Sequence, residues 1–278
     1  MIKAEMTESS KSSIMTMTYS AYRFDQAIVR SPARSVVTGL RAGKGESPTY
    51  DGIKAEHETY IQALTDAGVT VEILDPLDEF PDSIFVEDPA LVFTQGAILL
   101  NPGAPSRRGE SAVIEAVLNR HFPVVQALSG GRVEGGDVLN TRQGVMIGLS
   151  DRTNQEGAEA LAGCLDKFGL ESRIVETPEN VLHFKSDCSL LDDDLILTTQ
   201  RLAQSGVFEG FNTLITPEGE EGAANALRIN NVVFLAKYFP KTKAMLEDAG
   251  LNISLLDTSQ ISKIDAGLSC MSLRWSSK

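Results

Sequence analysis

The apolar and polar residues of this chain follow a pattern that repeats along its length. Three segments each combine the apolar end of a helix, a glycine that ends the helix and a short apolar strand: residues 64–75, 165–176 and 246–257. A fainter copy without the glycine lies at residues 117–126. Because its spacing from its neighbours is close to half the separation between Gly68 and Gly169, the repeat unit has about 50 residues.

Pairs of short apolar runs, joined by turn-forming residues, lie between the predicted helices and indicate β-hairpins. A unit of two strands, a helix and a strand, repeated about five times at this period, excludes a doubly wound sheet. Residues 200–217 lack a clear helical pattern. The predicted hairpins pair 90–93 with 97–100, 138–140 with 145–147 and Leu190 with 195–197, and the predicted helices are 51–67, 110–122, 154–168 and 241–249.

The chain of 278 residues, with 42% hydrophobic content, is long enough for one domain with a sizeable core. Residues 1–22 are rich in Ser, Thr and Met, so we expect a disordered tail before a single domain at residues 23–278. The tail lacks the apolar core of a signal peptide, and no segment approaches the roughly 18 apolar residues of a membrane helix. Three cysteines without an export signal favour reduced thiols and a cytoplasmic location.

The net charge of the chain is −13, from 25 Lys and Arg against 38 Asp and Glu. No basic stripe is visible that could neutralise phosphates, which disfavours nucleic acid and anionic membranes as partners. The charge mildly suits a cationic small molecule. The sequence leaves a homodimer open and does not decide the oligomeric state.

Two segments indicate an enzyme. Cys270 stands among small residues after a turn at 263–267, where a cysteine is placed like an exposed nucleophile. Asp82, Glu87 and Asp88 gather three carboxylates on one short predicted strand and its approach, which is costly to bury unless a cation lies between them. A thiolate beside a cation-binding pocket suggests attack on a guanidinium carbon. The alternatives are a packed thiol in an apolar run and a solvated strand end.

Six segments, in order along the chain, carry a resemblance to a known family. From about Phe24 to Trp275 the chain resembles the dimethylarginine dimethylaminohydrolases of the amidinotransferase superfamily. The resemblance implies a five-bladed α/β propeller of repeated ββαβ units and a reaction that needs no metal and no organic cofactor. The segments are 81–93 (PDSIFVEDPALVF), 101–110 (NPGAPSRRGE), 134–137 (EGGD), 151–157 (DRTNQEG), 182–186 (LHFKS) and 265–274 (DAGLSCMSLR).

The resemblance also implies three catalytic residues. Cys270 would be the nucleophile, His183 the acid and base, and Glu134 the carboxylate that orients the histidine. Without the resemblance, a lone histidine at a strand start is more often a core residue, and EGGD is only a hairpin turn. Among the other candidates, Cys164 is expected to pack on the apolar face of its helix, Cys188 in a strand, His57 on a solvated helix face and His121 at a helix end.

The substrate contacts are likewise implied by the resemblance. Asp82 and Asp88 would hold the guanidinium nitrogens, with Glu87 beside them, and Arg107 and Arg152 would bind an α-carboxylate. Taken alone, the two arginines are ordinary surface residues. Glu110, at the start of a predicted helix, is expected to favour the helix dipole and to contribute little to activity. The remaining contacts are Leu40, in a glycine-rich loop that would close over the substrate, and the backbone of Ile264.

The function that the resemblance implies is hydrolysis of N-ω-methylated arginine to citrulline and a methylamine. An arginine deiminase, or a hydrolase of another small guanidine, is the enzymatic alternative, although arginine deiminases carry an added helical domain for which this chain has no room. The alternative from another class is a catalytically silent propeller that binds a ligand. A thiol near histidine and carboxylates can bind zinc, which in this family would inhibit the enzyme.

Overall fold

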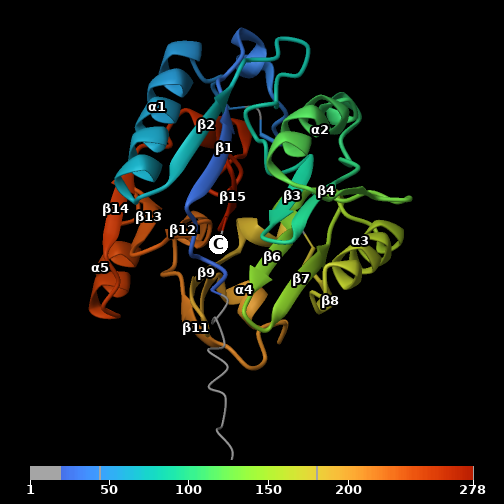
Figure 1. Ribbon diagram of the computed structural model, residues 1–278. Coiled ribbons are helices and arrows are strands. Elements are labelled where there is room, and N and C mark those ends of the chain that lie inside the picture. Colours follow the sequence, from blue (N-terminus) through green and yellow to red (C-terminus); the bar gives the residue numbers. More distant parts are fainter. Residues whose placement is uncertain (1–19, 44, 180, 278) are drawn as a thin grey trace, which may run out of the picture.

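The protein is described by a computed structural model that covers residues 20–43, 45–179 and 181–277. The described residues form five three-stranded sheets arranged around a common centre (Figure 1). The innermost strands of the five sheets line one shared cavity, as in a propeller. From the inner to the outer strand, the sheets are β15 (Leu273–Trp275), β1 (Gln26–Arg30), β2 (Thr70–Leu74); β3 (Ala90–Phe93), β4 (Gly96–Leu99), β5 (Val125–Ala127); β6 (Val138–Thr141), β7 (Gly144–Leu149), β8 (Ser172–Glu176); β9 (Cys188–Asp192), β10 (Leu195–Thr198), β11 (Asn212–Ile215); and β12 (Leu227–Ile229), β13 (Val232–Ala236), β14 (Ile253–Leu256).

Each sheet has the same internal order. The inner strand is antiparallel to the middle strand, the middle strand is parallel to the outer strand, and a helix connects the last two. The propeller of ββαβ units is thus confirmed, and the four predicted helices match to within a residue at each end. The connecting helices are α1 (Tyr50–Asp66), α2 (Glu110–His121), α3 (Gln155–Lys167), α4 (Gln200–Ala203) and α5 (Pro240–Asp248).

The fourth unit differs from the others because its helix is only one turn long. This length explains why residues 200–217 show no helical pattern. In the first, third and fifth units the helix ends in the glycine that the sequence marks, and Gly68, Gly169 and Gly250 have φ of 87°, 71° and 82°. Side chains rarely adopt this left-handed conformation, so glycine is favoured there. Short 3-10 helices complete the structure: η1 (Arg34–Thr38), η2 (Pro105–Arg107), η3 (Gly135–Asp137), η4 (Phe184–Ser186), η5 (Glu221–Ala224) and η6 (Ile261–Ile264).

The ring is closed by the two ends of the described chain. β15 pairs antiparallel with β1, and Gln26 lies opposite Trp275. Residues 1–19 of the expected tail lie outside the described residues, but Ala21 and Tyr22 are buried. The Tyr22 hydroxyl donates to Asp192 over 2.7 Å. The chain therefore packs against the propeller from slightly before residue 23.

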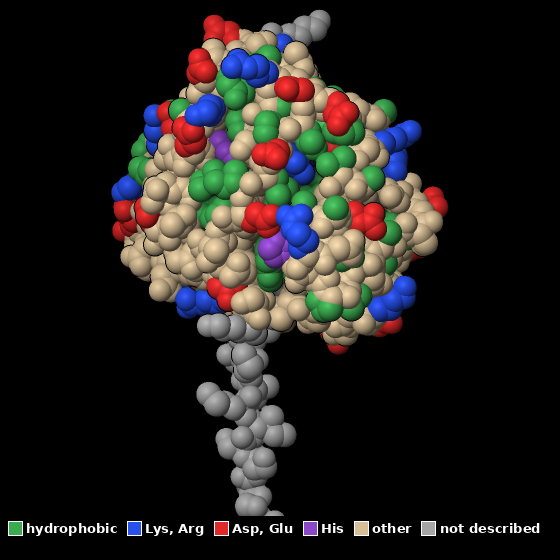
Figure 2. Space-filling model, turned by 45° about the horizontal axis from the view of Figure 1, so that its top comes forward, with side chains coloured by type: hydrophobic (Ala, Val, Ile, Leu, Met, Phe, Trp, Pro, Cys, Tyr) green, Lys and Arg blue, Asp and Glu red, His purple; other side chains and the backbone are tan. Residues whose placement is uncertain are grey.

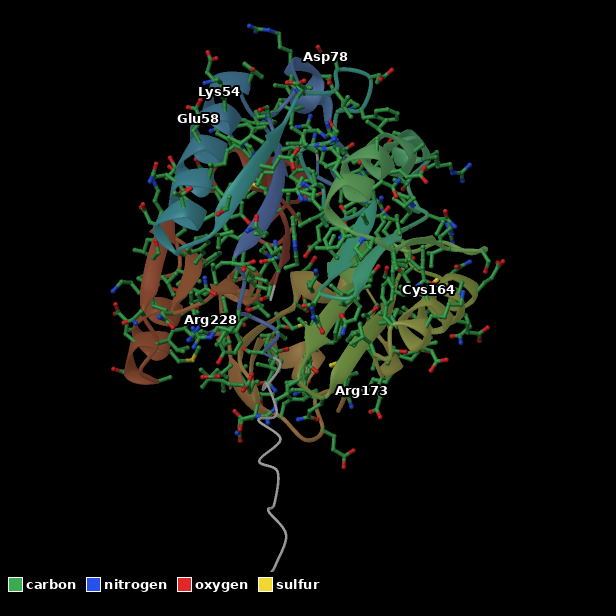
Figure 3. All side chains as sticks on the ribbon, viewed as in Figure 1. Lys54, Glu58, Asp78, Cys164, Arg173 and Arg228 are labelled. Carbon is green, nitrogen blue, oxygen red and sulfur yellow. The ribbon has the colours of Figure 1, made fainter. Side chains whose placement is uncertain are left out.

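The apolar faces of the helices pack on the sheets, and the polar faces meet solvent. Cys164, labelled on α3 in Figure 3, is buried against Val145 and Ile147 of β7, as expected of a packed thiol. Lys54 and Glu58 project outward from α1 and form an ion pair. Figure 2 shows side chains of both charge signs spread over the face in view. None of the described helices is both long and apolar enough to cross a membrane.

The environment of His57 differs from the expectation of a solvated helix face. The side chain is only 2% exposed, and its Nε2 has no hydrogen-bond partner. Burial lowers the pKa of His57 to about 4, so it is neutral near pH 7. Cys188 begins β9 and is fully buried, as predicted.

Candidate active site

One pocket collects nine of the ten residues that the sequence predicts for the site. Its volume is about 40 Å³. The loops that line the pocket come after strands of different sheets, so residues far apart in the sequence meet here. The nine residues are Leu40, Asp82, Asp88, Arg107, Glu134, Arg152, His183, Ile264 and Cys270.

Cys270 lies on the pocket wall just before β15. It is 9% exposed, and its carbonyl oxygen accepts a hydrogen bond from the Glu87 backbone N–H over 3.2 Å, which ties the thiol segment to the acidic segment. Burial raises the pKa of the Cys270 thiol to about 11, and the charges of Asp88 and Glu87 add to the rise. The thiol is therefore protonated near pH 7, and a cation bound between it and the carboxylates would favour the thiolate.

His183 and Glu134 form an ion pair in the same pocket. The His183 Nε2 lies 2.7 Å from Glu134 Oε2, and Glu134 is 1% exposed. Burial alone would lower the pKa of His183, but the hydrogen bond to Glu134, with the charges of Asp137 and Asp88, raises it to about 9. Burial likewise opposes ionisation of Glu134, yet the bond to His183 lowers its pKa to about 2. The imidazole is thus a cation near pH 7 that can donate a proton.

The EGGD turn explains how this pair is held. Asp137 is fully buried, and one of its oxygens accepts the backbone N–H of Phe184, the residue after His183, over 2.8 Å. Gly136 lies against the imidazole, since a Cβ there would come within 2.7 Å of the His183 Cγ. The other oxygen of Glu134 accepts the Ala104 N–H over 3.1 Å. The turn therefore has a role beyond that of a hairpin.

The segment from Asp82 to Asp88 is a pair of turns, and the prediction of a strand is wrong. The backbone N–H groups of Phe85 and Asp88 donate to the carbonyls of Asp82 and Phe85 over 2.9 and 3.3 Å. Both carboxylates are buried, at 4% and 3% exposure, so a solvated strand end is excluded. Asp82 Oδ1 accepts the Leu40 N–H over 2.9 Å, and burial raises the Asp82 pKa. Asp88 Oδ1 accepts the Gly136 N–H over 3.0 Å.

Glu87 is the predicted residue that does not line the pocket. Its Oε1 pairs with Lys185 Nζ at 2.7 Å and Arg274 Nη2 at 2.8 Å. These three residues line a separate cavity of about 110 Å³ among the innermost strands, which is larger than the pocket but contains neither Cys270 nor His183. Substrate contact by Glu87 remains a prediction that this arrangement does not support.

The two arginines have different surroundings. Arg107 is 3% exposed and bonds to Asp88 and Glu110, and also to the carbonyls of Asp82 and Phe85. Of the five guanidinium N–H donors, a single one on Nη1 is then left for a substrate. The side chain of Arg152 is 24% exposed and lies 3.3 Å from Glu134 Oε1. Arg152 is therefore the more available of the two.

Two loops border the pocket at Leu40 and Ile264. Leu40 is 38% exposed, and the Ala42 N–H donates to the carboxylate of Asp265. Asp265 follows Ile264 and has the left-handed φ of 54°. Asp265 lines the pocket but was not among the residues predicted from the sequence, although it begins segment 265–274. Lys44, in the expected closing loop, lies outside the described residues.

Asp88, Glu134 and His183 offer ligand atoms that lie within 4.8 Å of one another, which is close enough to hold a metal ion. All three groups already have protein partners: Arg107 at Asp88, and Arg152 and the His183 imidazolium at Glu134. A propeller that joins a thiol, an imidazolium–carboxylate pair and two buried aspartates in one pocket has the chemistry of an enzyme that acts on a guanidino group.

Known proteins agree with this class. A family model described as arginine deiminase matches residues 73–222. A dimethylarginine dimethylaminohydrolase from Pseudomonas aeruginosa is 39% identical over 254 residues, which cover 91% of this chain and 100% of the relative. Another dimethylarginine dimethylaminohydrolase, from Streptomyces coelicolor, is 33% identical, and the match covers 90% of this chain and 96% of the relative. The chain belongs to the dimethylarginine dimethylaminohydrolase family.

Solved structures agree with the fold. The Pseudomonas aeruginosa enzyme, as a cysteine-to-serine mutant complexed with citrulline, has a TM-score of 0.88 and 38% identity, and covers 91% of this chain and 100% of its own. The N-terminal domain of the cyanobacterial arginine dihydrolase ArgZ has a TM-score of 0.81 at 17% identity, and the match covers 91% of this chain and 99% of that domain. At that identity the likeness shows the fold alone.

Proposed function

We propose that this protein hydrolyses N-ω-methylated arginines to citrulline and methylamine or dimethylamine. The observation that carries the proposal is the presence of Cys270, the His183–Glu134 pair and the buried aspartates in one pocket. The relatives named as dimethylarginine dimethylaminohydrolases support the same substrate class.

Binding follows from charge and hydrogen bonding. Asp82 and Asp88 present buried carboxylate oxygens that can accept the guanidinium N–H groups. Arg152, with the remaining N–H of Arg107, can hold the α-carboxylate, while Ile264 and Leu40 line the same pocket. Burial and the nearby negative charges keep the Cys270 thiol protonated, and the arriving cation offsets those charges.

The reaction has two halves. The Cys270 thiolate forms a bond to the guanidino carbon, and the bond from that carbon to the methylated nitrogen breaks as His183 gives that nitrogen a proton. A water then attacks the thiouronium carbon and passes a proton to His183. The carbon–sulfur bond breaks as the second proton of that water passes to solvent, which releases citrulline and restores the thiolate. Glu134 keeps the imidazole oriented and cationic in the first half.

Citrulline release tests the proposal. It is measured with dimethylarginine, monomethylarginine and arginine, each with the wild type and with Cys270→Ser. Turnover of the methylated substrates by the wild type alone is expected. Turnover of arginine alone would indicate a deiminase, in keeping with the family model, and no turnover of any guanidine would indicate a binding protein.

A cytoplasmic location is supported by the free thiols of Cys164, Cys188 and Cys270. A homodimer is a prediction that solution scattering can test, because the mass of one chain is 30.0 kDa.

A further inference from the structure

Glu110 has surroundings that its position in the sequence does not reveal. As the first residue of α2, it would ordinarily interact with the helix dipole in water. Its side chain is instead 3% exposed, and both carboxylate oxygens face Arg107: Oε1 lies 3.0 Å from Nε, and Oε2 lies 2.6 Å from Nη2. This is the bidentate geometry of a strong ion pair. The expectation that Glu110 serves only the helix dipole is therefore wrong.

Arg107 connects Glu110 to the segment that carries Asp82 and Asp88, the two acidic residues of the pocket. Its Nη1 bonds to Asp88, while its Nη2 also donates to the carbonyls of Asp82, at 3.2 Å, and Phe85, at 2.9 Å. Those two carbonyls also accept the backbone hydrogen bonds of the two turns that carry Asp82 and Asp88. One guanidinium thus fixes both turns, and Glu110 fixes the guanidinium from the side away from Asp88.

The charges in this group set how strongly Asp88 can attract a cation. With Glu110 ionised, Arg107 is shared between two carboxylates, and the group of Asp88, Arg107 and Glu110 carries one net negative charge. Without the charge of Glu110, the Arg107 cation would be matched by Asp88 alone. The group would then be neutral, and less of the Asp88 charge would be left for a guanidinium in the pocket.

We infer that Glu110 is a positioning residue for substrate binding: it holds and partly neutralises Arg107, so that Asp88 stays oriented toward the pocket and keeps its negative charge for the guanidinium. This inference rests on the proposed function, since it assumes that a guanidinium binds at Asp88. It makes Glu110 a determinant of the preference for a cationic ligand over a neutral one, although Glu110 itself lies outside the pocket lining.

The experiment compares two ligands that share the amino-acid end and differ in charge at the other end. In a Cys270→Ser background, which removes the nucleophile, calorimetry measures the dissociation constants of arginine, with a cationic guanidinium, and of citrulline, with a neutral ureido group. Glu110→Gln removes the charge at nearly constant shape. We expect arginine to bind about ten- to a hundredfold more weakly, and citrulline to change by much less. Equal losses for both ligands, or no loss for arginine, would overturn the inference.

Two controls keep the outcomes separate. Glu115→Gln makes the same change on the exposed face of α2 and should leave both constants unchanged. If Glu110→Gln fails to fold, Glu110→Asp is measured instead, because it keeps the charge on a shorter side chain. We then expect a smaller loss of affinity, confined to arginine. An unchanged ratio of the two dissociation constants would refute the role of Glu110. If the Cys270→Ser protein binds neither ligand, the proposed function fails first, and the role of Glu110 fails with it.

Discussion

Replacing Glu134 by Gln tests the ion pair at the centre of the pocket. The change keeps the shape of the side chain and removes the carboxylate whose hydrogen bond, together with the charges of Asp137 and Asp88, raises the pKa of His183 from 6.5 to about 9. A rise of that size corresponds to about 3 kcal/mol of preference for the imidazolium. Because burial lowers the pKa and so opposes the remaining charges of Asp137 and Asp88, we expect the pKa of His183 in Glu134→Gln to fall to about its ordinary value. At pH 8 the protonated fraction would then drop from about nine tenths to about 3%.

Two assays measure this change. The histidine ring signals can be followed by NMR titration, because the chain has only three histidines and His183→Ala assigns the one in the pocket. The ratio of kcat/KM between variant and wild type is then measured from pH 5.5 to pH 9. We expect this ratio to be about thirtyfold lower near pH 8 than near pH 5.5, where both proteins carry the imidazolium. Glu209→Gln, an exposed change of the same kind, is the control.

The stability of the folded protein should also depend on pH through His183 and Glu134. The stabilisation from His183 is complete below pH 6.5 and is lost as the pH rises through about 9. The stabilisation from Glu134 is complete above pH 4.5 and is lost as the pH falls through about 2. A wild-type His183 that titrates near pH 6.5, or a kcat/KM ratio that does not vary with pH, would refute the reasoning.

Three further predictions concern the remaining groups of the pocket. Cys270→Ser should abolish turnover while the protein stays folded, because a hydroxyl is a far weaker nucleophile than a thiolate; citrulline formation within tenfold of the wild type, measured with the melting temperature, would contradict it. Asp88→Asn should lower kcat/KM on dimethylarginine by roughly two to four orders of magnitude, since breaking a buried ion pair costs about 3–5 kcal/mol and Arg107 loses its partner. An unchanged kcat/KM in a folded Asp88→Asn protein would mean that the cation does not bind there. Arg152→Ala should weaken substrates with an α-carboxylate far more than simple guanidines without one, and equal losses in kcat/KM would point to a structural role for this arginine.

The repeating architecture could be predicted because each unit encodes it locally. A glycine at a left-handed position and an apolar strand after it are short-range features, and they give helix ends to within a residue. α4 shows the limit, because a single turn is too short to produce a helical period.

The face of a helix that packs inward was harder to predict. Glu56 and Glu58 flank His57 and predict a solvated helix face, yet Glu56 is itself only 7% exposed. Its carboxylate accepts the backbone N–H groups of Gln260 and Ile261 over 2.7 and 2.9 Å, at the start of η6. A buried carboxylate with such partners looks like a surface residue in the sequence, since its partners lie about 200 residues away. Glu110 also looks like a surface residue in the sequence, although its partner Arg107 is only three residues away, because the groups that enclose this pair, at Asp82, Phe85 and Asp88, belong to another segment.

The candidate site was predicted through resemblance more than through pattern. Nothing local in the sequence brings Glu134 to His183, 49 residues away, or Asp88 to Arg107, 19 residues away, since each pair meets only after the strands between its members have folded. The resemblance also could not show that Glu87 turns away from the pocket toward Lys185.

The pairing of β15 with β1 means that folding and the onset of activity are coupled in this protein. Cys270 lies three residues before β15, so the strand that completes the first sheet also carries the nucleophile into place. Contacts between residues this distant in sequence form late and slowly, because the intervening chain must first be ordered. A partly folded chain that has built the middle sheets would still lack a working pocket. Recovery of activity during refolding should therefore report closure of the ring rather than formation of the individual sheets.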